Sequence, residues 1–166
     1  LNSKAGQDLL SWFTAILVLI SLVLIAVRLL LFPWFTQVEY HMPGFPDDRY
    51  GFTLEQRLEY SALAVEYLVN DAGISFLGDL RFPAGETAPA PSCQPPDDCT
   101  RLFNDRELQH MLDVKNTVKA AMWVLNGSLL FLLGLGFWAW RGSWSASFQR
   151  GLERGGWLTV IVIVTI

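Results

Sequence analysis

The sequence predicts an α-helical membrane protein with at least three transmembrane helices and an extracytoplasmic α+β segment between the first and the second. The prediction depends on three apolar runs in a chain of 166 residues, of which 52% are hydrophobic. Residues 9–27 and 120–140 contain no charged side chain, and residues 157–166 are uncharged as well. A helix needs about 20 apolar residues to cross the hydrocarbon core of a membrane. This clustering excludes an ordinary soluble domain.

The first transmembrane helix is expected at residues 9–35 and is expected to remain in the mature protein. A signal peptide is the alternative, but its apolar region usually has about 7–15 residues and ends near a small-residue cleavage site. The sequence LLLFPWFTQ, which follows the apolar run, has no such site. The chain begins with Leu1 and ends within an apolar run, so we expect it to be part of a longer product in which residues 157–166 start the third span.

The charges of the connecting segments predict the orientation in the cell membrane. The segment from Thr36 to Asp113 contains fourteen Asp and Glu but only five Arg, whereas residues 141–156 contain three Arg and one Glu. Short Arg-rich loops stay in the cytoplasm. We therefore expect a cytoplasmic amino terminus, an extracytoplasmic domain at residues 36–112, a second span at residues 113–140 and a cytoplasmic loop at residues 141–156.

Two kinds of element are expected early in the extracytoplasmic domain. Thr53 and Gln56 match a capping box, and apolar residues then recur at helical spacing, which predicts an amphipathic helix at residues 53–70. The stretches ISFLGDLRF and CTRLF are weakly strand-like and flank a Pro-rich segment. They predict a β-hairpin at residues 74–103 with a long tip.

Two cysteines, Cys93 and Cys99, lie in this tip as SCQPPDDC. A disulfide is the simplest interpretation outside the cytoplasm, with free thiols as the alternative. Metal binding is not expected, because no third cysteine or nearby histidine supports it.

A second capping box starts the helix that leads into the second span. Asn104 and Glu107 match its pattern, so the helix is expected to begin at residues 105–112 and to continue into the membrane. Several charged residues therefore occupy its first turns, at the outer membrane boundary.

Four polar side chains are expected to share one face of this helix. Spaced by three or four positions, they are Arg106, His110, Asp113 and Thr117. Glu107 lies one turn before His110 and can also reach it. A carboxylate beside a histidine can fix its tautomer and raise its basicity, as general-base catalysis requires. His110 is therefore the candidate catalytic residue, with Arg106, Glu107 and Asp113 as supporting or substrate-positioning residues.

Two further positions are candidates for contact with the substrate. Lys115 can meet lipid phosphates, since long basic side chains extend their ends to the interface. Arg28, near the outer end of the first span, can face the same pocket as His110. The structural alternative stays open for all of these residues, because charges often only solvate the end of a juxtamembrane helix or anchor a span.

The stretch RELQHMLDVK, which contains His110, resembles the bacterial lipoprotein intramolecular transacylase family of small multi-span integral membrane proteins. The resemblance covers most of the chain, including the amino-terminal span and the helix in FTLEQRLEYSALAVEYL. Its specific part is the motif REL-x-HM-x-DVK.

The resemblance implies an enzyme, an acyltransferase of the outer leaflet with His110 as general base. It would move an acyl chain from the glyceryl sn-2 ester of a diacylated lipoprotein to the amine of the terminal cysteine, and so produce a lyso-form lipoprotein. The implied partners are diacylated lipoproteins or membrane lipids, with no cofactor and no nucleic acid. Two alternatives remain: a non-enzymatic accessory subunit of a larger membrane complex, and an outer-face sensor or chaperone that binds lipoproteins.

Overall fold

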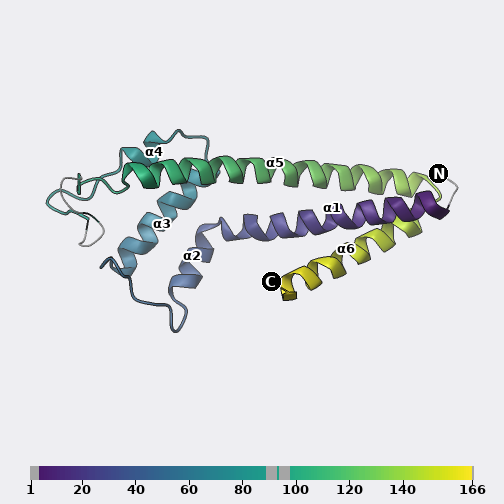
Figure 1. Cartoon of the computed structure of the whole chain (residues 1–166), viewed down its shortest axis with the longest axis horizontal. Coiled ribbons are helices and arrows are strands. Elements are labelled where there is room, and N and C mark those ends of the chain that lie inside the picture. Colours follow the sequence, from purple (N-terminus) through teal and green to yellow (C-terminus); the bar gives the residue numbers. More distant parts are fainter. Residues whose placement is uncertain (1–3, 89–92, 94–97, 166) are drawn as a thin grey trace. The chain divides into compact units, whose positions relative to one another are not determined.

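The computed structural model describes residues 4–88, 93 and 98–165, and every regular element in this part of the chain is an α-helix. The helices are α1 (Lys4–Leu30), α2 (Pro33–Tyr40), α3 (Leu54–Val69), α4 (Ser75–Gly78), α5 (Asp105–Arg141) and α6 (Ser145–Thr165) (Figure 1). The chain divides into unit 1, Leu1–Arg28 with Ala120–Ile166, and unit 2, Leu29–Lys119. The helix α5 contributes residues to both units.

Two helices are candidate membrane spans. The 27 residues of α1 and the 37 residues of α5 contain windows with mean hydropathies of 2.7 and 1.8. Only 22% and 17% of these windows are buried within the protein, whereas the core helix of a soluble protein is mostly buried. Large apolar side chains such as Leu130 and Leu133, 69% and 71% exposed, therefore face outward, as in a helix surrounded by lipid.

The prediction of at least three spans is not supported within the described residues. There, only α1 and α5 are long and apolar enough to cross a membrane. The first half of α6 carries Arg150, Glu153 and Arg154, which interrupt the apolar character that a span needs.

Most of the predicted loop at residues 141–156 is helical, because a three-residue turn at residues 142–144 leads directly into α6; its cytoplasmic location stays a prediction. Trp144 is 3% exposed, and its ring packs against Trp138 and Phe148 at centroid distances of 5.0 and 6.1 Å. The Trp144 carbonyl accepts hydrogen bonds from the Ser147 and Phe148 amides. Burial of Trp144 thus starts the helix, and the Arg residues lie on its surface.

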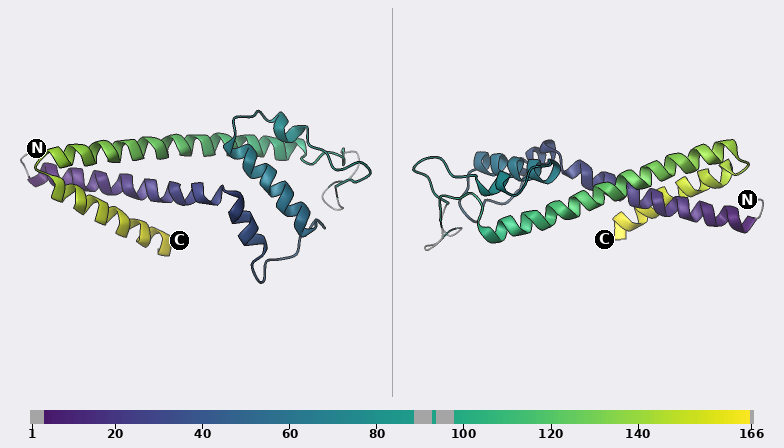
Figure 2. Two further views of the ribbon diagram at one scale, coloured as in Figure 1. Left: turned by 180° about the vertical axis from the view of Figure 1, so that it is seen from behind. Right: turned by 90° about the horizontal axis from the view of Figure 1, so that it is seen from above.

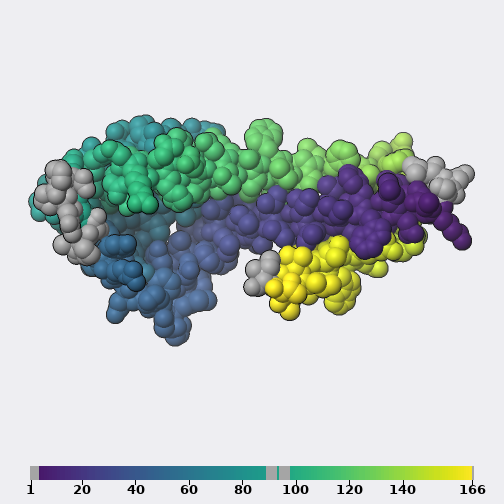
Figure 3. Space-filling model, viewed as in Figure 1, coloured from purple at the N-terminus to yellow at the C-terminus, as the bar shows by residue number. Residues whose placement is uncertain are grey.

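In unit 1, α6 lies directly against α1 (Figure 3). Small residues on both helices allow this contact. The buried residues of α6 recur every four positions, and they are Ser147, Gly151, Gly155 and Thr159. Their counterparts on α1 are also small, and they include Ser11, Thr14 and Ala15. Such residues let helix backbones approach closely, which is how helices associate where no water drives them together.

A buried polar contact joins α1 to α5 within the same unit. The hydroxyl groups of Ser21 and Ser128 lie 2.8 Å apart, and both residues are buried. The Ser128 hydroxyl also donates to the Leu125 carbonyl on its own helix. A hydroxyl in an apolar environment needs a partner, so this pair favours one alignment of the two helices.

The core of unit 2 forms where α3 and α4 pack against the first turns of α5 (Figure 2). Tyr67, Leu77 and Leu108, one from each helix, are its buried residues. The two predicted capping boxes are confirmed. Thr53 and Gln56 exchange side chain–backbone hydrogen bonds of 3.2 and 3.0 Å, and Asn104 and Glu107 exchange two of 2.9 Å.

The predicted β-hairpin at residues 74–103, and with it the α+β character of the segment, is not supported: the described residues contain no strand. Residues 75–78 form the short helix α4, because a helical turn places Leu77 between Tyr67 and Leu108. Only an isolated antiparallel bridge, Arg81 to Arg101, pairs the two predicted segments. The ladder stops there because the Thr100 amide donates to the Asp98 carboxylate at 3.1 Å instead of to the opposite segment.

The predicted disulfide is confirmed. Cys93 and Cys99 are bonded with an S–S distance of 2.01 Å and a Cα–Cα distance of 5.6 Å. The Cys99 carbonyl also accepts a hydrogen bond of 2.8 Å from the Ala88 amide, so the disulfide is tied to the base of the segment. Residues 89–92 and 94–97 of the predicted tip lie outside the described residues.

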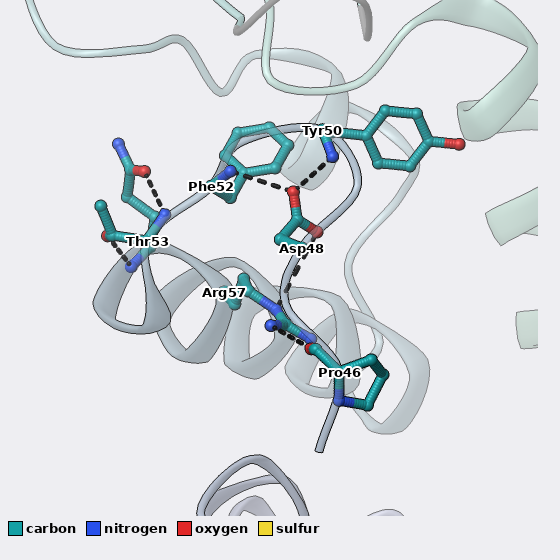
Figure 4. A network of polar contacts seen from close by, with 7 residues as sticks. Pro46, Asp48, Tyr50, Phe52, Thr53 and Arg57 are labelled. Atoms are coloured by element: carbon teal, nitrogen blue, oxygen red, sulfur yellow. Dashed lines mark hydrogen bonds and ion pairs between the residues drawn. The ribbon is translucent and has the colours of Figure 1, made fainter. Parts of the chain in front are cut away.

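A polar cluster orders the connection between α2 and α3 (Figure 4). Asp48 accepts hydrogen bonds from the Tyr50 and Phe52 amides at 2.7 and 3.0 Å. The Phe52 amide, followed by the Tyr50 amide and the Arg57 charge, lowers the pKa of Asp48, and partial burial opposes this effect. Arg57 also donates to the Pro46 carbonyl at 3.3 Å. The cluster therefore holds an irregular segment in one conformation.

Candidate functional site

The first turns of α5 have a packed side and an open side. Leu108 and Lys115 are buried and Met111 is half-buried on the side that faces α3 and α4. The open side carries the four residues predicted to share a face, and all four are exposed: Arg106, His110, Asp113 and Thr117. The helical register thus places the candidate base on the exposed side of α5.

His110 is not paired with either predicted carboxylate. Glu107 is bonded to Asn104 in the capping box, and Asp113 accepts a hydrogen bond of 3.2 Å from the side-chain amide of Gln109. Neither carboxylate contacts the imidazole among the residues described, because each has a closer local donor. Neither ring nitrogen of His110 has a hydrogen-bond partner within the part of the chain that the structure describes.

Lys115 has partners that the sequence did not suggest. It is only 4% exposed, and its ammonium group donates to the Asn70 side chain at 3.0 Å and to the Ala72 carbonyl at 2.6 Å. The same nitrogen lies 3.8 Å from the centre of the Tyr67 ring. The expectation that it meets lipid phosphates is thus corrected: Lys115 joins α5 to the segment that follows α3.

Lys119 adds a second, weaker link one turn later. Its ammonium group forms an ion pair with Asp71 at 3.1 Å, and both side chains are exposed. Ion pairs of this kind contribute little to stability in water, about 0–1 kcal/mol. The buried Lys115 is therefore the main polar connection between the helix that bears His110 and the end of α3.

Two other cationic candidates lie in different surroundings. Arg106 is exposed in the first turn of α5, one turn before His110. Residues four positions apart on a helix have Cβ atoms about 5–6 Å apart, so the guanidinium and the imidazole can reach one substrate. Arg28 is half-buried in the last turn of α1 and belongs to unit 1. Its shared pocket with His110 stays a prediction.

Unit 1 contains an apolar hollow of about 410 Å³ that the sequence did not reveal. It lies among α1, α5 and α6 and is lined entirely by apolar side chains, among them Val23, Ala121 and Val162. Such a surface accommodates hydrocarbon and offers no partner for a polar group. No group of His, Cys, Asp or Glu among the described residues has the geometry of a metal site.

The sequence also missed the close contact between α6 and α1. A pattern that indicates such a contact was present in the sequence: small residues recur every four positions and therefore lie on one face of a helix. They are Ser147, Gly151, Gly155 and Thr159. The Arg residues among them indicated a cytoplasmic loop instead. The partners of Lys115 had no comparable signal, because Asn70 and Ala72 are more than forty positions away.

Comparisons with known proteins point to one family. No solved structure matches the chain. An uncharacterized protein from Aquifex aeolicus (strain VF5) is 32% identical to this chain over 81 residues. The match covers 49% of this chain and 31% of the relative, or about a third of the relative's length. The family model described as lipoprotein intramolecular transacylase Lit matches residues 10–166. Since that match covers nearly the whole chain and α1 and α5 are candidate spans, the protein is a membrane protein of the lipoprotein intramolecular transacylase family.

Proposed function

We propose that this protein moves an acyl chain within a diacylated lipoprotein, from the glyceryl sn-2 ester to the α-amino group of the terminal cysteine. His110 is the general base of this reaction. The observation that carries the proposal is the exposed imidazole on the open side of α5, in a chain that belongs to this family. A base that already bonds a protein group would first have to release it, whereas both nitrogens of His110 are available.

The reaction needs a proton carrier more than any other group. As the amine nitrogen attacks the ester carbonyl carbon, a nitrogen–carbon bond forms and the amine proton passes to His110. The tetrahedral intermediate then collapses, and the bond between the carbonyl carbon and the glyceryl oxygen breaks. The leaving oxygen takes the proton back from the imidazolium, so the products are an amide and a free hydroxyl group with no net change in protons.

The protein contributes geometry and charge to this reaction. The amine and the ester belong to one lipid-anchored molecule, so holding them together removes most of the entropic cost of their encounter. The tetrahedral oxyanion needs a nearby donor. Arg106 is the candidate, because its guanidinium lies one helical turn from His110 on the same open side.

The proposed orientation has the amino terminus in the cytoplasm and residues 36–112 outside. Two observations support it: the Arg residues at 141–156, and the disulfide between Cys93 and Cys99. Short Arg-rich segments stay in the cytoplasm, and disulfides persist in oxidising compartments. In this orientation His110 lies at the outer surface, where the lipid anchors of lipoproteins are found.

The substitution His110→Ala tests the proposal in the full-length protein, in bacteria without such an activity of their own. The amino-terminal peptide of a reporter lipoprotein is analysed by mass spectrometry for a free or an acylated amine. We expect the yield of the lyso-form to fall by at least about a hundredfold, since general-base catalysis typically contributes about 10²–10⁴. Asn116→Ala, at another exposed position of α5, is the matched control and should leave the yield unchanged.

Both variants must be extracted as stable, monodisperse proteins for the comparison to hold. Undiminished acyl transfer by a folded His110→Ala variant would overturn the role of His110. If the parent protein itself produced no lyso-form but co-purified with partners in fixed stoichiometry, the alternative of an accessory subunit would replace the enzyme.

A further inference from the structure

The helix α2 exposes apolar side chains although it belongs to the polar unit 2. Trp34, Val38 and Met42 follow one another every four positions, and they are 52%, 49% and 57% exposed. Met42 lies two residues beyond the end of α2, in a turn where its amide donates to the Glu39 carbonyl at 3.1 Å. We call these three exposed residues the α2 stripe: Trp34 and Val38 lie one turn apart on one side of the helix, and Met42 follows in the turn after it.

The other sides of α2 have different surroundings. The Tyr40 ring packs against Phe45 at a centroid distance of 5.0 Å and lies 4.7 Å from the Arg57 guanidinium of α3. Gln37 and His41 are exposed next to the α2 stripe, and the His41 ring is 2.7 Å from the Gln37 carbonyl. The helix thus has one side held against α3, one apolar exposed side and one polar exposed edge.

The position of α2 in the chain indicates which environment meets the stripe. It begins at Pro33, and only two residues separate it from the end of α1 at Leu30. Because α1 is a candidate span, α2 starts at the level where the chain leaves the hydrocarbon core. Its eight residues extend only about 12 Å, which is too short to cross a membrane. A helix of this kind at this level fits the interface itself.

We propose that α2 lies in the plane of the membrane surface, with the α2 stripe inserted at the boundary between headgroups and acyl chains. Gln37 and His41 face the water. Interfacial helices bury their apolar side about 5–10 Å into this boundary, and Trp is enriched there because its ring is apolar with one polar group. The partner is the lipid surface that α1 enters, so the inference depends on α1 crossing the membrane and does not depend on acyl transfer.

The contacts of α2 give this placement a consequence for unit 2. Tyr40 and Arg57 connect α2 to α3, and Lys115 connects the end of α3 to α5. A lipid-inserted α2 would therefore hold the whole unit against the membrane surface. His110 belongs to the same unit, so the anchor would limit the distance between its imidazole and lipid-borne esters.

Spin labelling of the full chain in vesicles of phosphatidylethanolamine and phosphatidylglycerol tests the inference. A nitroxide is attached at Val38→Cys, and the matched control is Gln37→Cys on the adjacent polar edge. The natural cysteines are joined in a disulfide and should not react, which labelling of the parent protein verifies. Leu130→Cys on the candidate span and Glu55→Cys on the surface of α3 provide the lipid and water references.

Collisions with oxygen, which concentrates in lipid, and with a water-soluble nickel complex report the environment of each label. We expect the ratio of oxygen to nickel collisions to be severalfold higher at position 38 than at position 37, and between the two references. A water-like ratio at position 38 would overturn the inference. Lipid-like ratios at both positions would also overturn it, because they would mean that the whole helix is immersed in lipid. An immobile label at position 38 that neither reagent reaches would overturn it as well, because protein would then cover the α2 stripe.

Discussion

The close contact between α6 and α1 makes a sharp prediction about two neighbouring glycines. A Cβ atom added at Gly155 would lie 2.5 Å from the Val18 Cβ atom and 2.7 Å from the Ala15 carbonyl oxygen. Both distances are far below van der Waals contact, and a backbone oxygen cannot rotate away. At Gly156 an added Cβ atom meets nothing within 4 Å. Gly155→Ala and Gly156→Ala therefore place the same methyl group in a tight interface and in open space.

The magnitude follows from two opposing effects. Replacing a glycine by alanine inside a helix favours the folded state by about 1 kcal/mol. Forcing an extra methyl group into a packed interface costs about 1–3 kcal/mol. Gly156→Ala should therefore raise the free energy of unfolding by up to about 1 kcal/mol. The helix effect is common to both variants, so Gly155→Ala should be less stable than Gly156→Ala by about 1–3 kcal/mol.

The assay is unfolding of the detergent-solubilised protein by an increasing fraction of sodium dodecyl sulfate, followed by tryptophan fluorescence. Trp12 is a suitable probe, because its ring lies 4.9 Å from the Arg154 guanidinium across the same interface. We expect Gly155→Ala to unfold at a lower detergent fraction than Gly156→Ala. Equal midpoints for the two variants would refute the close packing of α6 on α1.

Two further predictions concern the polar contacts of unit 2, with the same unfolding measurement. Lys115→Met should lower the free energy of unfolding by about 2–3 kcal/mol, because it removes buried hydrogen bonds from a charged group. The control Lys119→Met should change the free energy of unfolding by less than about 1 kcal/mol. Equal losses in the two variants would contradict the buried role of Lys115. The Phe52 amide lowers the pKa of Asp48 below its usual 3.8, so the carboxylate stabilises the fold fully above about pH 4 and loses this effect as the pH falls through its folded-state pKa. Asp48→Asn should therefore be less stable at neutral pH and should lose less stability than the parent protein between pH 5 and pH 3, and parallel pH profiles would contradict the reasoning.

The parts of the fold that the sequence predicted correctly depend on neighbouring residues. The capping boxes at Thr53 and Asn104 each join residues three positions apart, so their pattern can be read directly from the chain. The disulfide between Cys93 and Cys99 closes a short loop and is local in the same sense. That Arg106, His110, Asp113 and Thr117 share one face of a helix also follows from helical spacing alone.

The sequence misled in two situations: where several residues compete for one partner, and where a distant residue decides the local conformation. Glu107 and Asp113 have the right spacing to reach His110, but the Asn104 amide and the Gln109 side chain bind them instead. Several partners compete for one carboxylate, and spacing does not rank them. The strand-like pattern before Phe82 failed for a related reason: burial of Leu77 in the core of unit 2 favours a helical turn.

By itself, the sequence determined that this protein has long apolar helices, where its helices α3 and α5 begin, and which residues share a face of α5 with His110. These properties depend on composition and on spacings within one or two turns. Only the tertiary structure decided that Lys115 points inward to Asn70 and that α6 packs on α1 through Gly155. A buried charge is stable only where a distant segment provides a polar partner, and two backbones can approach closely only where both helices have small residues. Which segments meet in this way is decided by the folded chain.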